Sequence, residues 1–256
     1  MTSRPAGALS VTGLTVTYGS NIANVEVNLE VGFGEVVGLI GPNGAGKTSF
    51  VDAVTGFVGS KGTVLLRGTR IDHLPAFRRR RAGLSRTWQA GELFANLSVT
   101  DNLRVADSPR VVRDVVGDLL GRSSKHQESL DDVMRLVGLD SVSHILAQDL
   151  SLGLQKLVGV ARSLVNPCSV VLLDEPAAGL DDNETALFAT RLRAVAEAGK
   201  GVLLIDHDTN LVFNVCDRVY VMDFGQIIFE GTPQDARTNS KVVESYLGTD
   251  AGVHIE

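Results

Sequence analysis

Residues 41–48, Gly-Pro-Asn-Gly-Ala-Gly-Lys-Thr, match the pattern G-x-x-x-x-G-K-[ST] of a phosphate-binding loop. Glycines in such a loop let the backbone adopt conformations closed to other residues, so that successive N–H groups converge on one anion. Lys47 would then reach the β- and γ-phosphate oxygens of a nucleotide, and the Thr48 hydroxyl would ligate Mg²⁺. The residues predicted to bind the nucleotide here are Gly41, Asn43, Gly44, Gly46, Lys47, Thr48 and Ser49.

Two adjacent carboxylates, Asp174 and Glu175, follow the apolar residues 170–173. An apolar run that ends in acids describes a buried parallel strand whose carboxyl end meets a ligand. Asp174 would hold Mg²⁺ directly or through water, and Glu175 would polarise an attacking water. A single acid there could equally be a helix cap, but two adjacent acids downstream of a phosphate-binding loop favour catalysis.

His207 and Tyr18 are two further candidates. Of the five histidines, only His207 follows a buried-strand pattern, residues 202–205, where it could contact a γ-phosphate, orient the water or simply be a satisfied polar residue. Tyr18 ends an alternating run just before Gly19. An aromatic side chain in this position could stack on an adenine ring or pack in the core.

The elements around these residues predict an α/β fold. The phosphate-binding loop lies between an apolar run, residues 36–40, and a helical pattern from residue 49, which is the context that the motif requires. Alternating residues in 14–18 and 25–31 predict half-buried antiparallel strands of a small sheet beside the nucleotide core. Further strands are predicted at 62–68 and 84–89, a helix capped by Ser151 at 151–165, and a hairpin at 219–231.

The central part of the chain is predicted to be a helical insertion. Residues 98–138 have helical patterning, with a capping box at Ser98 and Asp101, a polar mobile connection at 117–128 and a second helix that ends at Gly138. We therefore expect one domain, in which residues 1–89 and 157–256 form the nucleotide core with its β subdomain. Residues 90–156 would form the helical subdomain.

An arginine run follows Pro75, the expected first residue of a short helix. The arginines at 78, 79, 80 and 81 could bind phosphates or lipid headgroups, but a solvated helix face is favoured because the whole protein is acidic. We expect short helices near Pro233 and Lys241 at the end of the chain.

Composition narrows the class of protein. The 256 residues carry a formal net charge of −6, which argues against broad nucleic-acid binding. Cys168 and Cys216 are too few for a disulfide framework and are not spaced as a metal site, so a reducing cytosol is expected. The first residues lack the apolar core of a signal peptide, and no apolar run approaches the ~18 residues of a spanning helix. We therefore expect membrane association only through a partner.

Taken in order, these motifs resemble those of the ATP-binding cassette ATPases that drive membrane transporters. Residues 41–48 resemble the Walker A loop, and 170–175 resemble Walker B with its catalytic glutamate. Gln89 resembles the Q-loop glutamine, and the remaining matches are the signature motif at 150–155, the D-loop at 179–181 and the switch histidine at His207. Tyr18 falls where the family keeps its adenine-stacking aromatic.

The resemblance implies a P-loop (RecA-like) nucleotide-binding core with an N-terminal antiparallel β subdomain and an inserted α-helical subdomain. It implies ATP and Mg²⁺ as ligands, with Thr48, Gln89 and Asp174 around the metal and Glu175, His207 and Gln89 in catalysis. Two ATPase subunits, identical or paralogous, would face head to tail, so that Ser151 and Gly153 of one complete the ATP site of the other. Gln89 would pass the nucleotide state to a coupling helix of a permease, which would hold the chain at the inner face of the membrane.

Several segments are similar to those of the ATPase subunits of branched-chain amino-acid importers: residues 83–89, 93–94, 96–99, 206–208 and 242–248. The ATPases of lipopolysaccharide export and of urea or amide import are similar in the same segments. Two departures are an altered signature, with Leu152 for the first glycine and Leu154 for the glutamine, and Trp88 where the family usually has Phe.

Three other classes of function fit the sequence less well. Cassette proteins acting on ribosomes or DNA usually carry two cassettes or long coiled-coil insertions, whereas this chain has one cassette and a short insertion. A regulatory module that binds ATP without hydrolysing it is disfavoured by Glu175 and His207. A GTPase is disfavoured because the sequence has no N-K-x-D motif.

Overall fold

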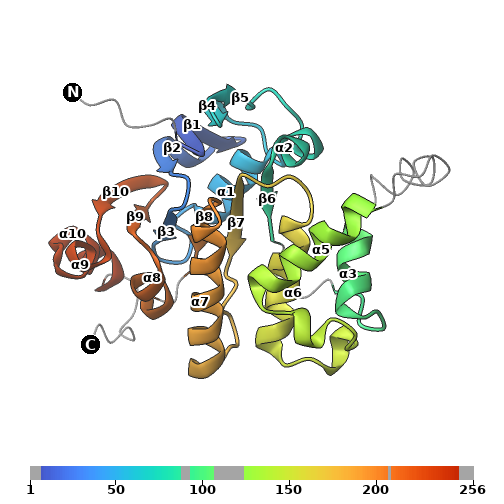
Figure 1. Ribbon diagram of the computed structural model, residues 1–256. Helices are drawn as coiled ribbons and strands as arrows, with labels where there is room; N and C mark the ends of the chain where they lie inside the picture. The colour runs from blue at the N-terminus through green and yellow to red at the C-terminus, as the bar shows by residue number, and fades with distance from the viewer. Residues whose placement is uncertain (1–6, 88–92, 107–123, 207–208, 248–256) are drawn as a thin grey trace.

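The computed structural model describes residues 7–87, 93–106, 124–206 and 209–247, as two sheets with a helical region beside them (Figure 1). The larger sheet has the order β10-β9-β3-β8-β7-β6. Its members are β3 (Val36–Ile40), β6 (Leu84–Arg86), β7 (Val170–Asp174), β8 (Gly201–Ile205), β9 (Arg218–Asp223) and β10 (Gln226–Gly231). All neighbours pair in parallel except β10, which returns antiparallel along β9 as the predicted hairpin.

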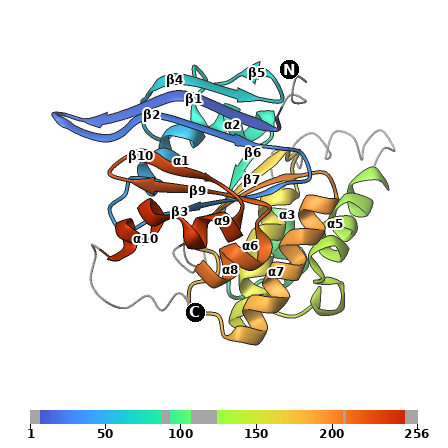
Figure 2. The ribbon, with the colours of Figure 1, turned by 90° about the vertical axis from the view of Figure 1, so that its left-hand side faces the viewer.

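The smaller sheet is the predicted antiparallel one, with the order β2-β1-β4-β5. It is built from β1 (Leu9–Tyr18), β2 (Asn21–Val31), β4 (Lys61–Leu66) and β5 (Thr69–Arg70). Figure 2 shows this sheet lying above the larger one, with α1 (Lys47–Thr55) between them. The α/β class and the β subdomain are therefore confirmed.

Two apolar cores lie on opposite faces of the larger sheet. Successive side chains of a strand point to opposite faces, so in β7 Val171 and Leu173 join one core while Val170 and Leu172 join the other. The second core also takes in α1 and the smaller sheet. The first core is covered by α6 (Leu152–Leu164), α7 (Asp182–Glu197) and α8 (Thr209–Val215). Burial on both faces explains why the central strands are continuous apolar runs.

The helical region lies beside one end of the larger sheet (Figure 1). It contains α3 (Val99–Ala106), α5 (Ser124–Val137) and the 3₁₀ turns Asp140–Val142 and Ala147–Asp149. Half of the predicted capping box at the start of α3 is present, because the Asp101 N–H donates to Ser98 Oγ at 3.1 Å. The Asp101 carboxylate accepts from the Ser98 hydroxyl at 2.7 Å, instead of from the Ser98 N–H that a capping box would use. α6 runs without a break through residue 156, so the subdomain boundary stays a prediction.

The predicted mobile connection at 117–128 is wrong in its second part, because α5 already begins at Ser124. The prediction of a connection rested on the polar composition of this segment, but Lys125, Gln127 and Glu128 are polar residue types that favour a helix. The helix then packs through Leu130, Met134 and Val137, which recur at helical spacing and are buried. Residues 107–123 lie outside the described ranges.

The prediction of a solvated arginine face is wrong for two of the four arginines of α2 (Ala76–Ala82). Arg79 is buried, and its guanidinium donates to the carbonyls of Ala53 and Val54 at the end of α1, each at 2.8 Å. Arg80 donates to the Ser163 carbonyl at 3.1 Å. The last carbonyls of a helix have no intrahelical donor, so α2 supplies one, while the neighbouring arginines 78 and 81 stay exposed beside the Phe77 ring.

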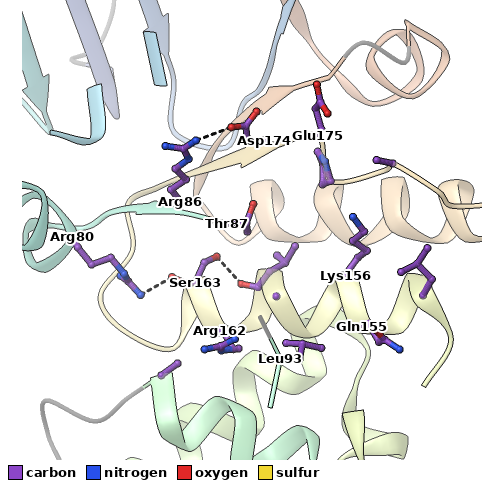
Figure 3. A pocket seen from close by; sticks show the side chains of 16 residues that line it. Arg80, Arg86, Thr87, Leu93, Gln155, Lys156, Arg162, Ser163, Asp174 and Glu175 are labelled. Atoms are coloured by element: carbon purple, nitrogen blue, oxygen red, sulfur yellow. Dashed lines mark hydrogen bonds and ion pairs between the residues drawn. The ribbon is translucent and has the colours of Figure 1, made fainter. Parts of the chain in front are cut away.

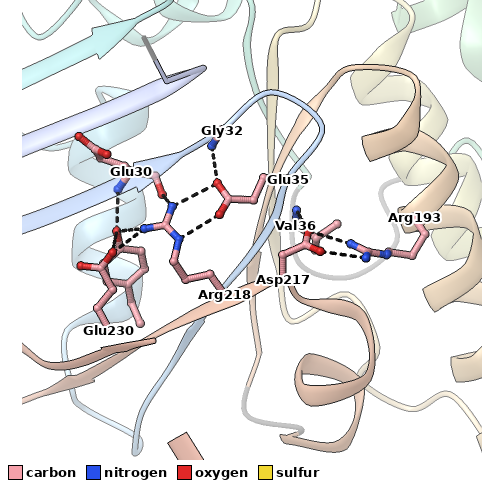
Figure 4. Close-up of polar contacts among 9 residues, drawn as sticks. Glu30, Gly32, Glu35, Val36, Arg193, Asp217, Arg218 and Glu230 are labelled. Atoms are coloured by element: carbon pink, nitrogen blue, oxygen red, sulfur yellow. Dashed lines mark hydrogen bonds and ion pairs between the residues drawn. The ribbon is translucent and has the colours of Figure 1, made fainter. Parts of the chain in front are cut away.

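An arginine of β9 joins the two sheets (Figure 4). Arg218 pairs with Glu35 at 2.9 Å and with Glu230 of β10 at 2.6 Å, and it donates to the Glu30 carbonyl of β2 at 3.0 Å. The preceding residue, Asp217, accepts from the Val36 amide at 2.9 Å and pairs with Arg193 of α7. These contacts hold the start of β3, and with it the strand that leads into the phosphate-binding loop.

Two short helices close the described chain as predicted, α9 (Pro233–Thr238) and α10 (Ser240–Leu247). In the described parts of the chain, none of the helices is long and apolar enough to cross a membrane.

Candidate nucleotide site

The predicted phosphate-binding loop connects the buried end of β3 to the start of α1. Gly46 takes the cap position with a φ of 103°, and within the described residues no side chain caps the first turn, which also lacks an acid. The N–H groups of that turn therefore remain available, and a helix N-terminus with available N–H groups attracts an anion. Asn43, Gly44 and Thr48 are exposed at this point, as a ligand site requires.

Two of the loop glycines are required by close approach. A Cβ on Gly41, whose φ is 151°, would lie 2.0 Å from the Met222 carbonyl oxygen of β9. A Cβ on Gly46 would lie 2.6 Å from the Ala23 carbonyl oxygen of β2. Gly44, in contrast, has a φ of 83° and open space around it. The loop is thus pressed against β2 and β9 on one side and open on the other, which leaves a cradle that side chains would fill.

Lys47 folds back over this loop. Its ammonium donates to the Gly41 carbonyl at 2.6 Å and to the Pro42 carbonyl at 3.0 Å, and the side chain is buried. Burial lowers the pKa of Lys47, and the nearby charges of Glu175 and Asp174 partly offset this effect. The predicted phosphate ligand and the predicted catalytic acids are therefore close enough to interact, although more than a hundred residues separate them in the sequence.

Asp174 lies at the carboxyl end of β7 and is almost fully buried, with 4% of its surface exposed. Its Oδ2 accepts from the Arg86 guanidinium of β6 at 2.8 Å (Figure 3). The same guanidinium pairs with Asp52 of α1. Sequence reasoning missed Arg86. The signal was available, because Arg86 ends a strand of the same sheet and carboxyl ends of parallel strands share one edge.

Glu175 follows with a φ of 46°, a backbone conformation uncommon for residues other than glycine. Its N–H donates to the Ile205 carbonyl of β8 at 2.7 Å, so the neighbouring strand holds this turn in place. Such backbone strain persists where the surroundings enforce it, and it concentrates at functional sites. The turn ends the strand, and Glu175 is among the residues that line a cavity beside Asp174.

That cavity has a volume of about 700 Å³ and lies between the ends of β6 and β7 and the helix α6. Arg86, Asp174 and Glu175 line one side, and Gln155 and Lys156 line the other (Figure 3). The sequence did not predict that α6 faces the two acids.

The N-terminus of α6 carries the altered signature. Ser151 caps it as predicted, accepting from the Leu154 N–H at 3.4 Å. The Gly153 N–H, however, donates to the Glu184 carboxylate of α7 at 3.0 Å. A carboxylate of the same chain thus occupies an N–H that the family resemblance assigns to a phosphate of a second subunit.

The two unusual leucines of this motif have different surroundings. Leu152 is 42% exposed and lies beside Gly179, where a Cβ would come within 3.2 Å of its side chain. Leu154 is half-buried and packs against the core of α6 and α7. Leu154 therefore has an apolar packing role within its own chain, which accounts for an apolar residue at that position.

The remaining predicted residues fall into two groups. Tyr18 ends β1 opposite Asn21 with 46% of its surface exposed, so it is not a core side chain and adenine stacking stays a prediction. Gln89 and His207, together with Trp88, lie outside the described residues. Among the residues that are described, no three His, Cys, Asp or Glu side chains gather as a metal site. Thr48 and Asp174 nevertheless offer the oxygen ligands that Mg²⁺ takes alongside substrate phosphates.

Comparisons with known proteins agree with this geometry. Residues 25–178 match the sequence model of the family described as "ABC transporter", and residues 226–252 match the one described as "Branched-chain amino acid ATP-binding cassette transporter". The chain is 37% identical to the high-affinity branched-chain amino acid transport ATP-binding protein LivG of Escherichia coli (strain K12), over 94% of this chain and 97% of that protein. It is 35% identical to BraF of Pseudomonas aeruginosa, a protein of the same description, over 96% and 99%.

Solved structures show the same fold. The crystal structure of the ADP conformation of an ATP-binding cassette of an ABC transporter superimposes with a TM-score of 0.82 at 26% identity, covering 94% of this chain and 98% of the other. The cbiO1 protein of Clostridium perfringens, part of the ABC transporter complex cbiONQ, reaches 0.77 at 25% identity, covering 95% of each chain.

Proposed function

The chain belongs to the ABC transporter family of ATP-binding cassettes, and we propose that it is the ATP-hydrolysing subunit of an importer for branched-chain amino acids. The choice of branched-chain amino acids as the solute rests on the similarity of this chain to LivG and BraF along nearly its whole length, together with the matching C-terminal segment. Urea or amide import and lipopolysaccharide export remain the alternatives within the family.

ATP binding begins at the first turn of α1. The N–H groups behind Gly44 and Gly46 receive the phosphates, and Lys47 exchanges its carbonyl partners for phosphate oxygens. Lys47 is well suited to this exchange, because an ammonium is a compact charge with rotatable donors. Asn43 and Ser49 flank the phosphates, and Tyr18 stacks on the adenine from the end of β1.

Hydrolysis depends on the acids at the end of β7. Glu175 orients the attacking water and accepts its proton as the water attacks the terminal phosphorus. Thr48 and Asp174, with Gln89, would hold the Mg²⁺, which neutralises charge on the phosphates when bound. His207 assists at the terminal phosphate.

The assembly follows the family pattern. A second ATPase subunit, identical or paralogous, presents Ser151 and Gly153 to the ATP held by the first, and the Gly153 N–H exchanges the Glu184 carboxylate for a phosphate oxygen. Transmembrane permease subunits bind near Gln89 and hold the chain at the cytoplasmic face of the membrane. Nucleic acid is not among the proposed partners. We propose that residues 1–89 and 157–256 form the nucleotide-binding core with its β subdomain, and that residues 90–156 form the helical subdomain.

Purification with the membrane fraction tests this proposal. The tagged chain is expected to bring down two permease subunits, and vesicles containing the purified complex and its solute-binding protein should accumulate leucine, isoleucine or valine only with ATP. Lys47→Ala should abolish both ATP binding and uptake, while Lys61→Ala on the exposed start of β4 serves as the control. Uptake of urea or amides instead would replace the solute, and association with ribosomes or DNA alone would exclude transport.

A further inference from the structure

We propose that Arg86 is a positioning residue that holds the two predicted magnesium ligands, Thr48 and Asp174, at a set separation. The two ligands belong to different elements, α1 and β7, which no stretch of continuous secondary structure connects. Arg86 belongs to a third element, β6. The inference rests on the proposed function, because Thr48 and Asp174 are magnesium ligands only in an ATPase of this kind.

The first observation is the contact with Asp174. Arg86 Nη2 donates to Asp174 Oδ2 at 2.8 Å, and the two side chains are 10% and 3% exposed. A charge pair so well shielded from water is strengthened by the low local dielectric and is costly to break on one side only. One oxygen of the Asp174 carboxylate is thus committed to Arg86, which fixes the orientation of the other.

The second observation is the contact with α1. The other terminal nitrogen of the same guanidinium, Nη1, pairs with the Asp52 carboxylate. Asp52 follows Thr48 by four residues on α1, and residues at this spacing lie on one face of a helix, one turn apart. By holding Asp52, Arg86 therefore also holds the turn of α1 that carries Thr48.

The chemistry of the guanidinium explains why an arginine occupies this position. Its planar fork presents two donors in a fixed geometry, so two carboxylates bound to it have a defined separation. Its charge also offsets the repulsion between the two carboxylates that it binds. A lysine would keep the charge but has no rigid fork, and a methionine would keep the length but neither the charge nor the donors.

Positioning of ligands has a consequence that a plain structural ion pair lacks. Groups that hold metal ligands in place typically change metal affinity by ~10–100-fold when they are removed. Loss of Arg86 should therefore weaken ATP binding in the presence of Mg²⁺ and leave metal-free binding through the loop and Lys47 nearly unchanged.

The experiment measures ATP affinity of the full-length chain by calorimetry, once with EDTA and once across a Mg²⁺ titration. Four proteins are compared: wild type, Arg86→Met, Arg86→Lys and the control Arg78→Met, whose side chain is exposed on α2. With EDTA, all four should bind ATP with similar affinity. With Mg²⁺, the apparent metal affinity should fall ~10–100-fold in Arg86→Met, by a smaller factor in Arg86→Lys, and not at all in Arg78→Met.

The possible outcomes distinguish failure of the positioning role of Arg86 from failure of the proposed ATPase function. If wild type shows no effect of Mg²⁺ on ATP binding, the magnesium ligands of the proposed function are wrong. If wild type responds and both Arg86 variants respond with the same midpoint, only the inference is overturned. A tighter metal midpoint in the variants would also overturn it, because Arg86 would then compete with the metal. Arg86→Lys keeps the test decisive if Arg86→Met does not fold.

Discussion

Replacing Arg79 by alanine should destabilise the protein far more than replacing its neighbour Arg78. The Arg79 side chain is buried and donates to four backbone carbonyls: those of Ala53 and Val54 at the end of α1, and those of Asp72 and Leu74 before α2. Arg78 lies one position away on the exposed side of the same helix. The pair therefore compares a capping arginine with a solvated one at equal change of charge.

The magnitude follows from these contacts. Each carbonyl left without its charged donor costs roughly 1–3 kcal/mol, and the lost cation at the C-terminus of α1 adds about 0.3–1 kcal/mol. The gain from no longer burying a guanidinium offsets part of this, as does water entering the vacated space. Burial lowers the pKa of Arg79 and the Asp72 charge opposes this shift, in keeping with the cost of burying a cation. A net loss of about 3 kcal/mol results.

Thermal and denaturant unfolding measure this loss. In a chain of this size a loss of about 3 kcal/mol lowers the Tm by roughly 6–12 °C. Arg78→Ala should stay within about 0.5 kcal/mol of wild type, and Arg79→Lys should be intermediate because it retains the charge but not the fork. If Arg79→Ala and Arg78→Ala unfolded together, the capping role would be refuted.

Three further changes have defined outcomes. Glu175→Gln should retain ATP binding, measured by calorimetry, while phosphate release falls by two orders of magnitude or more, about the contribution of a positioned general base; turnover at the parental rate would exclude Glu175 as that base. Gly41→Ala should lower stability and ATP affinity more than Gly44→Ala, because the new Cβ at position 41 would lie 2.0 Å from the Met222 carbonyl oxygen, whereas the one at position 44 would meet no atom within 4 Å; equal losses would contradict this steric account. Burial alone would raise the pKa of Asp217, but Arg193 and the Val36 amide outweigh it and hold the pKa below its usual range. Asp217 therefore stabilises the fold at neutral pH and loses this effect as the pH falls below about 4. The difference in unfolding free energy between wild type and Asp217→Asn, under about 1 kcal/mol for so exposed a pair, should stay constant from pH 7 to about 4 and shrink at lower pH; a difference that does not shrink in acid would argue against the charged form.

Much of the fold was predictable from local pattern. The runs that became β3, β7 and β8 are apolar, except for Asp174 at the end of β7, because the strands are buried on both faces. The alternating runs became strands of the smaller sheet. Glycines and caps marked the ends of elements, as at Gly138 and Ser151. These signals depend on neighbours in the chain, so one sequence is enough to read them.

The arginines mark where local pattern failed. Arg79 and Arg80 belong to a run of like charges, and such runs are usually solvated. Only the docking of α2 against the end of α1 and against α6 gave them buried carbonyl partners. Glu184 likewise reads as an ordinary acid in the first turn of α7, and its contact with the Gly153 N–H exists because α6 and α7 pack side by side.

By itself, the sequence determined the family of this protein, and it predicted the chemistry: a loop for phosphates, and two acids for a metal and a water. These properties depend on residue types at short spacings along the chain, which can be recognised without knowing the tertiary contacts. Only the tertiary structure decided which groups share the site, because Arg86, Asp52 and Asp174 meet from three elements that are far apart in the chain. Lys47 likewise folds onto its own loop through contacts that no spacing in the sequence records.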